Sequence, residues 1–264
     1  MALPPPSPDS TCVVTGASSG IGSEFARELT RRGYDLTLVA RREDRLRELA
    51  AELGDGASVH ACDVNDVNAR AGLADALTAN GKHVSILINN AGFSTSGPFV
   101  RSDRDRELGM VRTNIEAVVD FCSLFGPGMA DRGAGAILNV ASTASFQPLP
   151  MQATYAATKA FVLSFTESLH AELDGSGVAV TALCPGPVKT EFVDVAEIPG
   201  AESMPGMFWA SAEDTAKAGI KGLERNKRVV IPGALNRAGA LGGQHAPRSL
   251  VLRLTSRAHP ARRK

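Results

Sequence analysis

The sequence predicts an α/β fold with a doubly wound parallel sheet and helices on both faces, and three observations lead to this prediction. Short runs of aliphatic and β-branched residues alternate along the chain with longer segments of helical periodicity. The short runs contain few polar residues, as expected for strands that helices cover on both sides. The first run is followed directly by a glycine-rich turn that opens a helical segment. A chain of 264 residues can form this fold as a single domain.

Strands and helices are expected in strict alternation, which requires crossover connections and parallel pairing. Each strand is a run of mainly aliphatic or β-branched residues, and each helix has apolar residues at helical spacing. The strands are expected at residues 11–15, 36–40, 58–61, 84–89, 136–141, 178–183 and 229–231. The helices are expected at residues 20–32, 43–53, 66–80, 103–131, 154–174 and 211–225.

The composition is that of an ordinary globular protein. Hydrophobic residues make up 44% of the chain and charged residues 21%. The first residues lack the basic and apolar regions of a secretory signal, and no apolar run is long enough to cross a bilayer, so we expect a cytoplasmic protein. The four cysteines have no metal or redox spacing and are expected to be buried thiols. They are Cys12, Cys62, Cys122 and Cys184.

The chain is expected to have three parts. The Pro-rich residues 1–9 are too polar to pack and predict a disordered leader. Residues 10–232 are expected to form the α/β domain, and residues 233–264 a C-terminal extension. The extension is basic: residues 225–264 contain ten Lys or Arg and no Asp or Glu, although the whole chain has 28 residues of each kind.

Within the extension, residues 248–257 combine leucines with arginines and could form a basic amphipathic helix. Such a helix would bind a membrane surface or an acidic partner. The alternative is subunit packing or a solvated chain end. Nucleic acid is not an expected partner, because the sequence contains neither an aromatic platform nor a known nucleic-acid module.

The glycine-rich turn after the first strand is expected to bind a pyrophosphate. Its sequence, Thr-Gly-Ala-Ser-Ser-Gly-Ile-Gly, permits a tight turn and a close approach of the backbone to the ligand. The helix that follows presents its positive end and free N–H groups to the phosphates. The first candidate cofactor-binding residues are Gly16, Ser18, Ser19, Gly20, Ile21 and Gly22.

The end of the second strand indicates which dinucleotide binds. An acidic residue there would bind the ribose 2′-hydroxyl of NAD and repel a 2′-phosphate, but this chain has Arg41 and Arg42. Their guanidinium groups can hold a phosphate, to which Ser18 adds a hydroxyl. The alternative is a solvated helix start, although cations are unfavourable at that end of a helix. The sequence therefore predicts NADP(H).

Candidate catalytic residues follow at the same sheet edge. Tyr155 and Lys159 are four residues apart at a helix start and share one face. A nearby ammonium favours the phenolate and lowers the pKa of a tyrosine from about 10 toward neutrality. Ser142 ends the fifth strand, and Asn-Asn-Ala-Gly (89–92) ends the fourth, where open α/β sheets place their ligands. Each feature is commonplace alone, but together they indicate acid–base chemistry beside a nucleotide.

In this order, the glycine turn, Asn-Asn-Ala-Gly, Ser142 and Tyr-x-x-x-Lys resemble the short-chain dehydrogenase/reductase family. The resemblance covers roughly residues 10–231. It implies a seven-stranded Rossmann-type sheet in the order 3-2-1-4-5-6-7, with the cofactor across the carboxyl ends of the strands. It also implies a homodimer or homotetramer, with interfaces formed by the helices 103–131 and 154–174.

The resemblance further implies a role for each motif residue. Tyr155 exchanges a proton with the substrate oxygen while hydride passes between the nicotinamide and the carbon, and Ser142 binds that oxygen. Lys159 binds the nicotinamide ribose and lowers the pKa of Tyr155, and Asn114 holds a water that relays protons from Lys159. The other implied cofactor contacts are Asp63, Val64, Asn90, Ala91, Gly92, Pro185, Gly186, Val188 and Thr190, of which Thr190 reaches the carboxamide and Asp63 could instead be a turn residue.

Metal and hydrolase sites are not expected. The sequence contains no Gly-x-Ser-x-Gly motif and no Ser-His-Asp order. The histidines lack the spacing of metal ligands. They are His60, His83, His170, His245 and His259.

The substrate is expected to be bound by a lid at residues 191–210. Its Met204, Met207, Phe208 and Trp209 either line an apolar pocket or pack the lid on its own domain. The leading interpretation is a reductase of an apolar ketone, aldehyde or acyl-type group. One alternative is a reductase of 3-oxoacyl groups on an acidic carrier protein that docks on the basic tail. The other is a non-catalytic NADP-binding sensor or scaffold, which would give the four candidate catalytic residues no reason to occur together.

Overall fold

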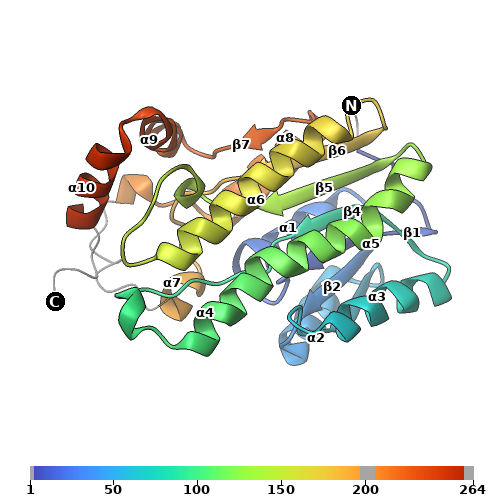
Figure 1. Ribbon diagram of the computed structural model, residues 1–264. Helices are drawn as coiled ribbons and strands as arrows, with labels where there is room; N and C mark the ends of the chain where they lie inside the picture. Colours follow the sequence, from blue (N-terminus) through green and yellow to red (C-terminus); the bar gives the residue numbers. More distant parts are fainter. Residues whose placement is uncertain (1–2, 197–205, 259–264) are drawn as a thin grey trace.

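The computed structural model describes residues 3–196 and 206–258, which contain one seven-stranded parallel sheet (Figure 1). The strand order is β3-β2-β1-β4-β5-β6-β7, so the predicted fold class and strand order are confirmed. The strands are β1 (Ser10–Thr15), β2 (Leu36–Ala40), β3 (Ala57–Ala61), β4 (His83–Asn89), β5 (Gly135–Val140), β6 (Val178–Leu183) and β7 (Val229–Val230).

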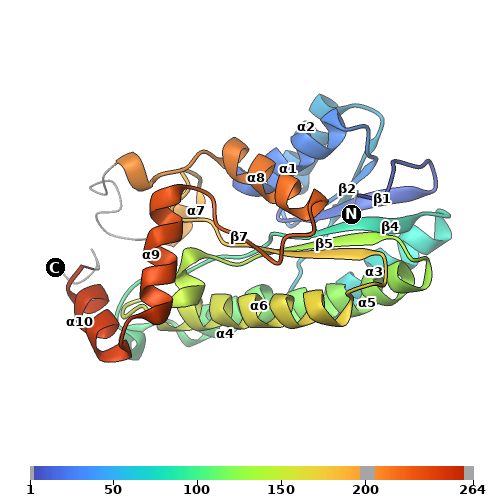
Figure 2. The same ribbon diagram turned by 90° about the horizontal axis from the view of Figure 1, so that it is seen from above.

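Helices cover both faces of the sheet, as Figure 2 shows from above. One face carries α1 (Gly20–Arg31), α2 (Glu43–Leu53) and α8 (Ala212–Glu224). The other carries α3 (Val67–Ala79), α4 (Arg104–Val111), α5 (Ala117–Asp131) and α6 (Ala153–Glu172). Shorter elements are α7 (Phe192–Val195) and 3₁₀ helices at Phe99–Arg101, Thr143–Phe146 and Gly206–Phe208.

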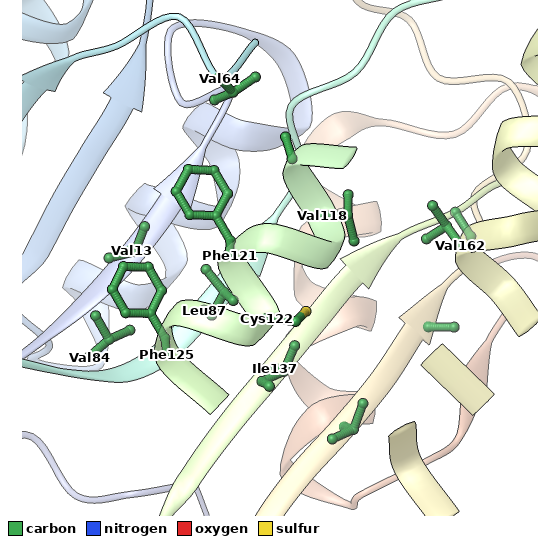
Figure 3. Packing of buried hydrophobic residues seen from close by; sticks show 14 of the residues in the cluster. Val13, Val64, Val84, Leu87, Val118, Phe121, Cys122, Phe125, Ile137 and Val162 are labelled. Atoms are coloured by element: carbon green, nitrogen blue, oxygen red, sulfur yellow. The ribbon is translucent and has the colours of Figure 1, made fainter. Parts of the chain in front are cut away.

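The strands are largely apolar because most of their side chains alternate between two separate cores. In β1, Val13 belongs to the core under α3, α5 and α6, whereas its neighbours Cys12 and Val14 belong to the core under α1, α2 and α8. Figure 3 shows the first of these cores, in which Phe121 and Phe125 of α5 lie beside Val13 of β1 and Val84 and Leu87 of β4. The two rings are stacked with their centres 6.1 Å apart. All four cysteines are free and buried.

The helical segment expected at 103–131 is interrupted by a π turn at Arg112–Glu116, which joins α4 to α5. The turn contains Asn114, whose side chain is completely buried. A π turn inserts one residue without ending the helix, so the apolar periodicity on either side does not indicate it. Such turns often mark functional sites, and this one lies beside the candidate catalytic residues.

The N-terminal residues 3–9 differ from the expected disordered leader, because they are held on the domain. The hydroxyl of Tyr34 donates to the carbonyl of Pro4 at 2.8 Å, and the ammonium of Lys82 donates to the carbonyl of Pro8 at 2.6 Å. Leu3 packs on the core under α1. Prolines have little backbone freedom to lose, so a few such contacts can hold this segment in place.

The extension forms two helices, α9 (Ala234–His245) and α10 (Arg248–Ala258), beyond one end of the sheet (Figures 1 and 2). The helix expected at 248–257 is thus present. Ala240 of α9 is buried in the core under α5 and α6, and Val251 of α10 is also buried. The extension therefore packs on the α/β domain. Among the described helices, none has both the length and the apolarity needed to span a membrane.

A buried arginine joins α3 to α5. Arg70 is only 1% exposed, and its guanidinium donates to Asp120, to Glu116 at 2.8 Å and to the carbonyl of Val64. Because Val64 follows β3, this arginine fixes the loop at the end of that strand. Each of the three guanidinium nitrogens has an acceptor, so removal of the side chain leaves these acceptors without this donor.

We expect Arg70→Ala to lower the free energy of unfolding by about 2 kcal/mol, because it leaves the Val64 carbonyl and two carboxylates without their donor. Urea denaturation followed by circular dichroism measures this change. Arg47→Ala is the matched control, since Arg47 pairs with Glu43 on the exposed face of α2. Equal midpoints for the two variants would show that the buried network adds no stability.

Candidate active site

One large cavity, of about 710 Å³, opens at the carboxyl ends of the parallel strands. It gathers residues that are far apart in the sequence, including nearly every predicted cofactor and catalytic residue. Of the predicted residues, those that line it are Gly16, Ser18, Ser19, Gly20, Ile21, Arg41, Arg42, Asp63, Val64, Asn90, Ala91, Gly92, Ser142, Tyr155, Lys159, Pro185, Gly186, Val188 and Thr190. Gly22 and Asn114 lie outside the lining and support it from below.

The glycine turn has the shape of a cradle that side chains would fill. Gly16 and Gly20 have φ angles of +67° and +61°, which L side chains rarely adopt. Gly22 has no such angle, but a Cβ atom there would lie 2.2 Å from the carbonyl oxygen of Gly16. The turn therefore brings the start of α1 directly against the end of β1, and its backbone N–H groups are available to a phosphate.

Asn90 at the end of β4 holds this turn in place. Its side-chain amide donates to the carbonyls of Thr15 at 3.0 Å and Gly16 at 3.3 Å. In return, the hydroxyl of Thr15 accepts from the backbone N–H groups of Asn90 and Ala91, each at 3.0 Å. The Asn90 amide, predicted as a cofactor contact, is thus engaged in bracing the turn, although the residue also lines the cavity.

Two arginines stand at the mouth of the cavity after β2. Arg42 donates to the hydroxyl of Ser18 at 3.0 Å, to that of Ser19 at 2.7 Å and to the carboxylate of Glu191 at 2.8 Å. Arg41 lines the cavity and has no ion pair within the described chain. Both cations and the Ser18 hydroxyl are therefore together, as predicted for a phosphate site.

After β3, Asp63 and Val64 face the same cavity. The carboxylate of Asp63 accepts from the backbone N–H of Asn65 at 3.0 Å. Asp63 therefore also stabilises a turn, the alternative to a cofactor contact that the sequence left open. The neighbouring Asn65 accepts from the hydroxyl of Thr113 at 2.7 Å, which ties this loop to the π turn. The loop is thereby anchored on both sides, by Thr113 and by Arg70.

The candidate catalytic side chains converge on one buried point. Tyr155 in α6 is 9% exposed and Lys159, one turn later, 4%. The Lys159 ammonium lies 5.9 Å from the centre of the Tyr155 ring and donates to the carbonyl of Val140 at 2.8 Å. Ser142 begins the 3₁₀ helix after β5, where its hydroxyl accepts from the backbone N–H of Ala144 at 3.1 Å.

Burial shifts the pKa values of these groups in opposite directions. It raises the pKa of Tyr155 to about 12, an effect that a hydrogen bond with Ser142 opposes, and it lowers the pKa of Lys159 to about 8. The sequence predicted that Lys159 lowers the pKa of Tyr155. In the structure the loss of hydration outweighs any such effect, because water is excluded from both groups.

Asn114 is held by three protein partners. Its side-chain oxygen accepts from the backbone N–H of Phe93 at 3.2 Å, and its amide donates to the Phe93 carbonyl and to the hydroxyl of Thr158, each at 3.1 Å. A Cβ atom on Gly92 would lie 3.0 Å from the Asn114 side-chain oxygen and 3.4 Å from the Lys159 nitrogen. The Asn114 oxygen and the Lys159 nitrogen thus both lie close to the position that a side chain on Gly92 would occupy. The Asn114 side chain is engaged with protein, so a relayed water would have to bind the main chain of the π turn.

The substrate end of the cavity is built largely from residues that the motifs did not indicate. Trp209 lines the cavity as one predicted alternative requires, but Met207 is 74% exposed and does not. Met204 and the side chain of Phe208 lie outside the described part of the chain. The further lining residues include Phe93, Gln147, Leu149, Gln152, Phe192, Val193, Val195 and Thr255.

The extension contributes to this end of the cavity. Thr255 of α10 lines it, and Gly243 of α9 lies so close to Gln147 that an added Cβ atom would be 2.0 Å from the amide oxygen. Nothing in the spacing of residues 233–258 indicates these contacts. Within the described ranges, no three His, Cys, Asp or Glu side chains are grouped so as to hold a metal ion.

A family model described as short chain dehydrogenase matches residues 10–197, well over half of the chain. The chain belongs to the short-chain dehydrogenase family. This agrees with the Ser142, Tyr155 and Lys159 arrangement and with the strand order, and it confirms the resemblance that the motifs indicated.

Characterised relatives of this family differ in substrate. Sulfoacetaldehyde reductase 2 of Chromohalobacter salexigens is 39% identical over 187 residues, which cover 68% of this chain and 73% of that protein. The very-long-chain 3-oxoacyl-CoA reductase of Anas platyrhynchos is 35% identical over 192 residues, which cover 70% of this chain and 62% of that protein. Among solved structures, a short-chain dehydrogenase from Sphingobium yanoikuyae in complex with NADPH is 34% identical, with a TM-score of 0.79 over 89% of this chain and 92% of that one.

We expect Gly22→Ala to weaken NADPH binding by about tenfold to a hundredfold, because its methyl group overlaps the Gly16 carbonyl and must push the turn apart. Fluorescence titration with NADPH measures the dissociation constant. Gly72→Ala is the matched control, since a Cβ atom at this position in α3 meets nothing within 4 Å. If Gly22→Ala binds NADPH as tightly as Gly72→Ala does, the glycine turn does not need a residue without a side chain at position 22 to bind the cofactor.

Proposed function

We propose that this short-chain dehydrogenase is an NADP(H)-dependent reductase of an apolar ketone, aldehyde or acyl-type carbonyl. The observation that carries the proposal is the position of the buried Tyr155 between the dinucleotide end of the cavity and an apolar substrate end. The ring of Phe192 packs on Tyr155, with ring centres 5.8 Å apart, and Phe93 and Leu149 lie beside it. A carbonyl carbon placed there would meet an acid and an apolar surface together.

The residues around the glycine turn fit NADP(H). The part of the cavity lined by Gly16, Gly20 and the N-terminus of α1 suits a pyrophosphate, and Asp63 and Val64 suit the adenosine. Arg41, Arg42 and Ser18 suit a 2′-phosphate. Two similar structures support this cofactor: the Sphingobium yanoikuyae dehydrogenase with NADPH and a serine dehydrogenase with NADP⁺, which is 32% identical with a TM-score of 0.73.

Tyr155 acts as the acid in reduction. When bound, NADPH supplies hydride to the carbonyl carbon, which makes the oxygen basic. The raised pKa keeps Tyr155 protonated at neutral pH, so it has a proton to give to that oxygen. Ser142 donates a hydrogen bond to the same oxygen and stabilises its developing charge.

Lys159 and Asn114 support the proton transfer. The phenolate left on Tyr155 is stabilised by the Lys159 ammonium, the only lysine that lines the cavity within the described chain. Lys159 also reaches the region between Gly92 and Val140, where it can bind the nicotinamide ribose. Asn114 positions the Phe93 backbone and Thr158, and the π turn around it leads protons from Lys159 toward solvent through a water held by main-chain groups.

An uncharged substrate fits better than a small anionic one. The relative from Chromohalobacter salexigens is named for sulfoacetaldehyde, whose sulfonate requires a cation. Among the described residues, those that line the cavity around Phe93, Leu149 and Trp209 include amides and hydroxyls but no arginine. The guanidinium of Arg106 lies nearby but is held by the carbonyl of Val195 at 3.1 Å, and the arginines that line the cavity are at the 2′-phosphate end. The Phe192 and Trp209 side chains instead offer aromatic surface.

A second candidate is the reduction of 3-oxoacyl groups on an acidic carrier. Two observations favour it: the similarity to the 3-oxoacyl-CoA reductase of Anas platyrhynchos, and the basic extension, whose α10 supplies Thr255 to the cavity and exposes Arg248 and Arg253. A phosphate-bearing carrier could dock there and deliver its acyl chain.

The expected homo-oligomer also stays a proposal. Exposed apolar residues on α4, α5 and α6 favour it, among them Leu108, Leu124 and Phe161, whose ring stacks on Phe165. The cytoplasmic location and peripheral membrane contact remain predictions from the sequence.

We expect Tyr155→Phe to lower the turnover of every accepted carbonyl by about a hundredfold to ten-thousandfold while NADPH binds as in the wild type, because only the proton donor is lost. NADPH oxidation is measured across ketones and aldehydes of increasing chain length, and NADPH and NADH affinities are compared by titration. The proposal requires tighter binding of NADPH and rates that rise along the apolar series. Unchanged turnover in Tyr155→Phe would refute the role of Tyr155 as the proton donor. If the wild-type protein binds NADPH but reduces none of the carbonyl compounds, the alternative of a non-catalytic NADP-binding sensor is favoured.

We expect the rate of carbonyl reduction to be flat at neutral pH and to fall as the pH rises above about 8. Below its lowered pKa of about 8, Lys159 is charged and stabilises the phenolate that forms on Tyr155; above it, this charge is lost. The rate with saturating NADPH is measured from pH 6 to 10, and deuterated NADPH shows whether hydride transfer limits it. A hydride-limited rate that stays constant to pH 10 would contradict this role of Lys159.

A further inference from the structure

Arg42, one of the two arginines expected to hold the 2′-phosphate, already holds an anion of the chain itself. The carboxylate of Glu191 accepts from Arg42 at 2.8 Å through one oxygen and from Arg45 at 2.5 Å through the other. These two cations hold the pKa of Glu191 at about 2, so the carboxylate is ionised at any physiological pH. A negative charge therefore lies at the mouth of the cavity beside the proposed phosphate site.

Glu191 and a 2′-phosphate share Arg42 as a donor, whereas Arg41 has no ion pair in the described chain. The remaining N–H groups of Arg42 are directed to the hydroxyls of Ser18 and Ser19 in the glycine turn, so its guanidinium spans the turn and Glu191. A phosphate bound by Arg42 and Ser18 would be close to the Glu191 carboxylate. Two anions that share one guanidinium repel each other and divide its hydrogen bonds.

Glu191 is also fixed by its place in the chain. It follows Thr190, whose side chain lies over Gly20, with its nearest atom 3.1 Å from the position of an added Cβ. It precedes α7, whose Phe192 packs on Tyr155. The carboxylate is therefore held at the junction of the phosphate end and the substrate end of the cavity.

We propose that Glu191 is a specificity-determining residue for the cofactor: an internal anion that competes with the 2′-phosphate for Arg42 and thereby limits the preference for NADP(H) over NAD(H). This inference rests on the proposed 2′-phosphate site. The Arg42 and Glu191 side chains are 42% and 43% exposed, so solvent screens the competition and its effect is moderate. It should also weaken with added salt.

The test compares 2′-AMP with 5′-AMP as ligands, because they differ only in where the phosphate lies and require no turnover. We expect Glu191→Gln to tighten 2′-AMP binding by about two- to fivefold and to leave 5′-AMP binding unchanged, as measured by calorimetry. The affinity of Glu191→Gln for NADPH should rise as its affinity for 2′-AMP does, and its affinity for NADH should stay unchanged, like that for 5′-AMP. Increasing salt should reduce the difference between variant and wild type.

Glu43→Gln is the matched control. Glu43 is also an exposed carboxylate at the start of α2, but it pairs with Arg47 and not with Arg42. This variant removes the same charge from the same region and should leave the ratio of the two affinities as in the wild type. If Glu43→Gln tightens 2′-AMP binding as much as Glu191→Gln does, the effect comes from the change in net charge alone, and the inference is overturned.

The remaining outcomes separate this inference from the function on which it rests. If the wild type prefers 2′-AMP and Glu191→Gln keeps or weakens that preference, Glu191 does not compete, and only the inference fails. If neither protein distinguishes 2′-AMP from 5′-AMP, the 2′-phosphate site itself is wrong, and the inference fails with it.

Discussion

The close approach of the glycine turn to the end of β4 is the constraint on which the active site depends. The start of α1 can lie against β1 only because Gly16 and Gly22 carry no side chains, and the added methyl at Gly22 would be 2.2 Å from a carbonyl oxygen. Asn90 and Thr15 then lock the two strand ends together through paired hydrogen bonds. This fixes the helix terminus, the dinucleotide cradle and the following Gly92 in one frame. The Lys159 and Asn114 side chains in turn lie close to Gly92, in space that a side chain there would occupy.

The sequence predicts those parts of the site that are encoded locally. Strand limits, the glycine turn, Arg41 and Arg42, and the Tyr155 and Lys159 pair can all be read from short-range spacing, and the structure brings them to one cavity. It does not predict contacts that depend on packing between distant segments. Gly243 lies against Gln147, and Thr255 lines the cavity, only because α9 and α10 pack back on the α/β domain. The π turn at Asn114 is missed because it preserves the helical pattern. For Met207 the sequence leaves two alternatives open, a pocket wall or packing of the lid on its own domain, and the 74% exposed side chain does not line the cavity.

Tyr155 and Lys159 show how one environment prepares two groups for different tasks. Exclusion of water favours the neutral form of each. It keeps the tyrosine protonated at neutral pH, as the proposed proton donor requires, and brings the pKa of the lysine close to neutrality. The two shifts have the same cause, since both side chains lie in the same buried region between α6 and β5. The proposed proton path therefore requires no further charged residue at the cavity floor, where the hydroxyl of Ser142 and the main chain of Val140 supply the polar contacts.

The packing of α9 and α10 has a consequence for how the protein matures during synthesis. All seven strands and every motif of the dinucleotide cradle lie before residue 231, whereas Gly243 and Thr255 emerge from the ribosome later. The nucleotide half of the cavity can thus form on a nascent chain whose substrate half still lacks a wall. Binding of cofactor to this early form would stabilise the sheet by mass action before the final helices dock. Selectivity for the carbonyl compound is then the last property that the chain acquires.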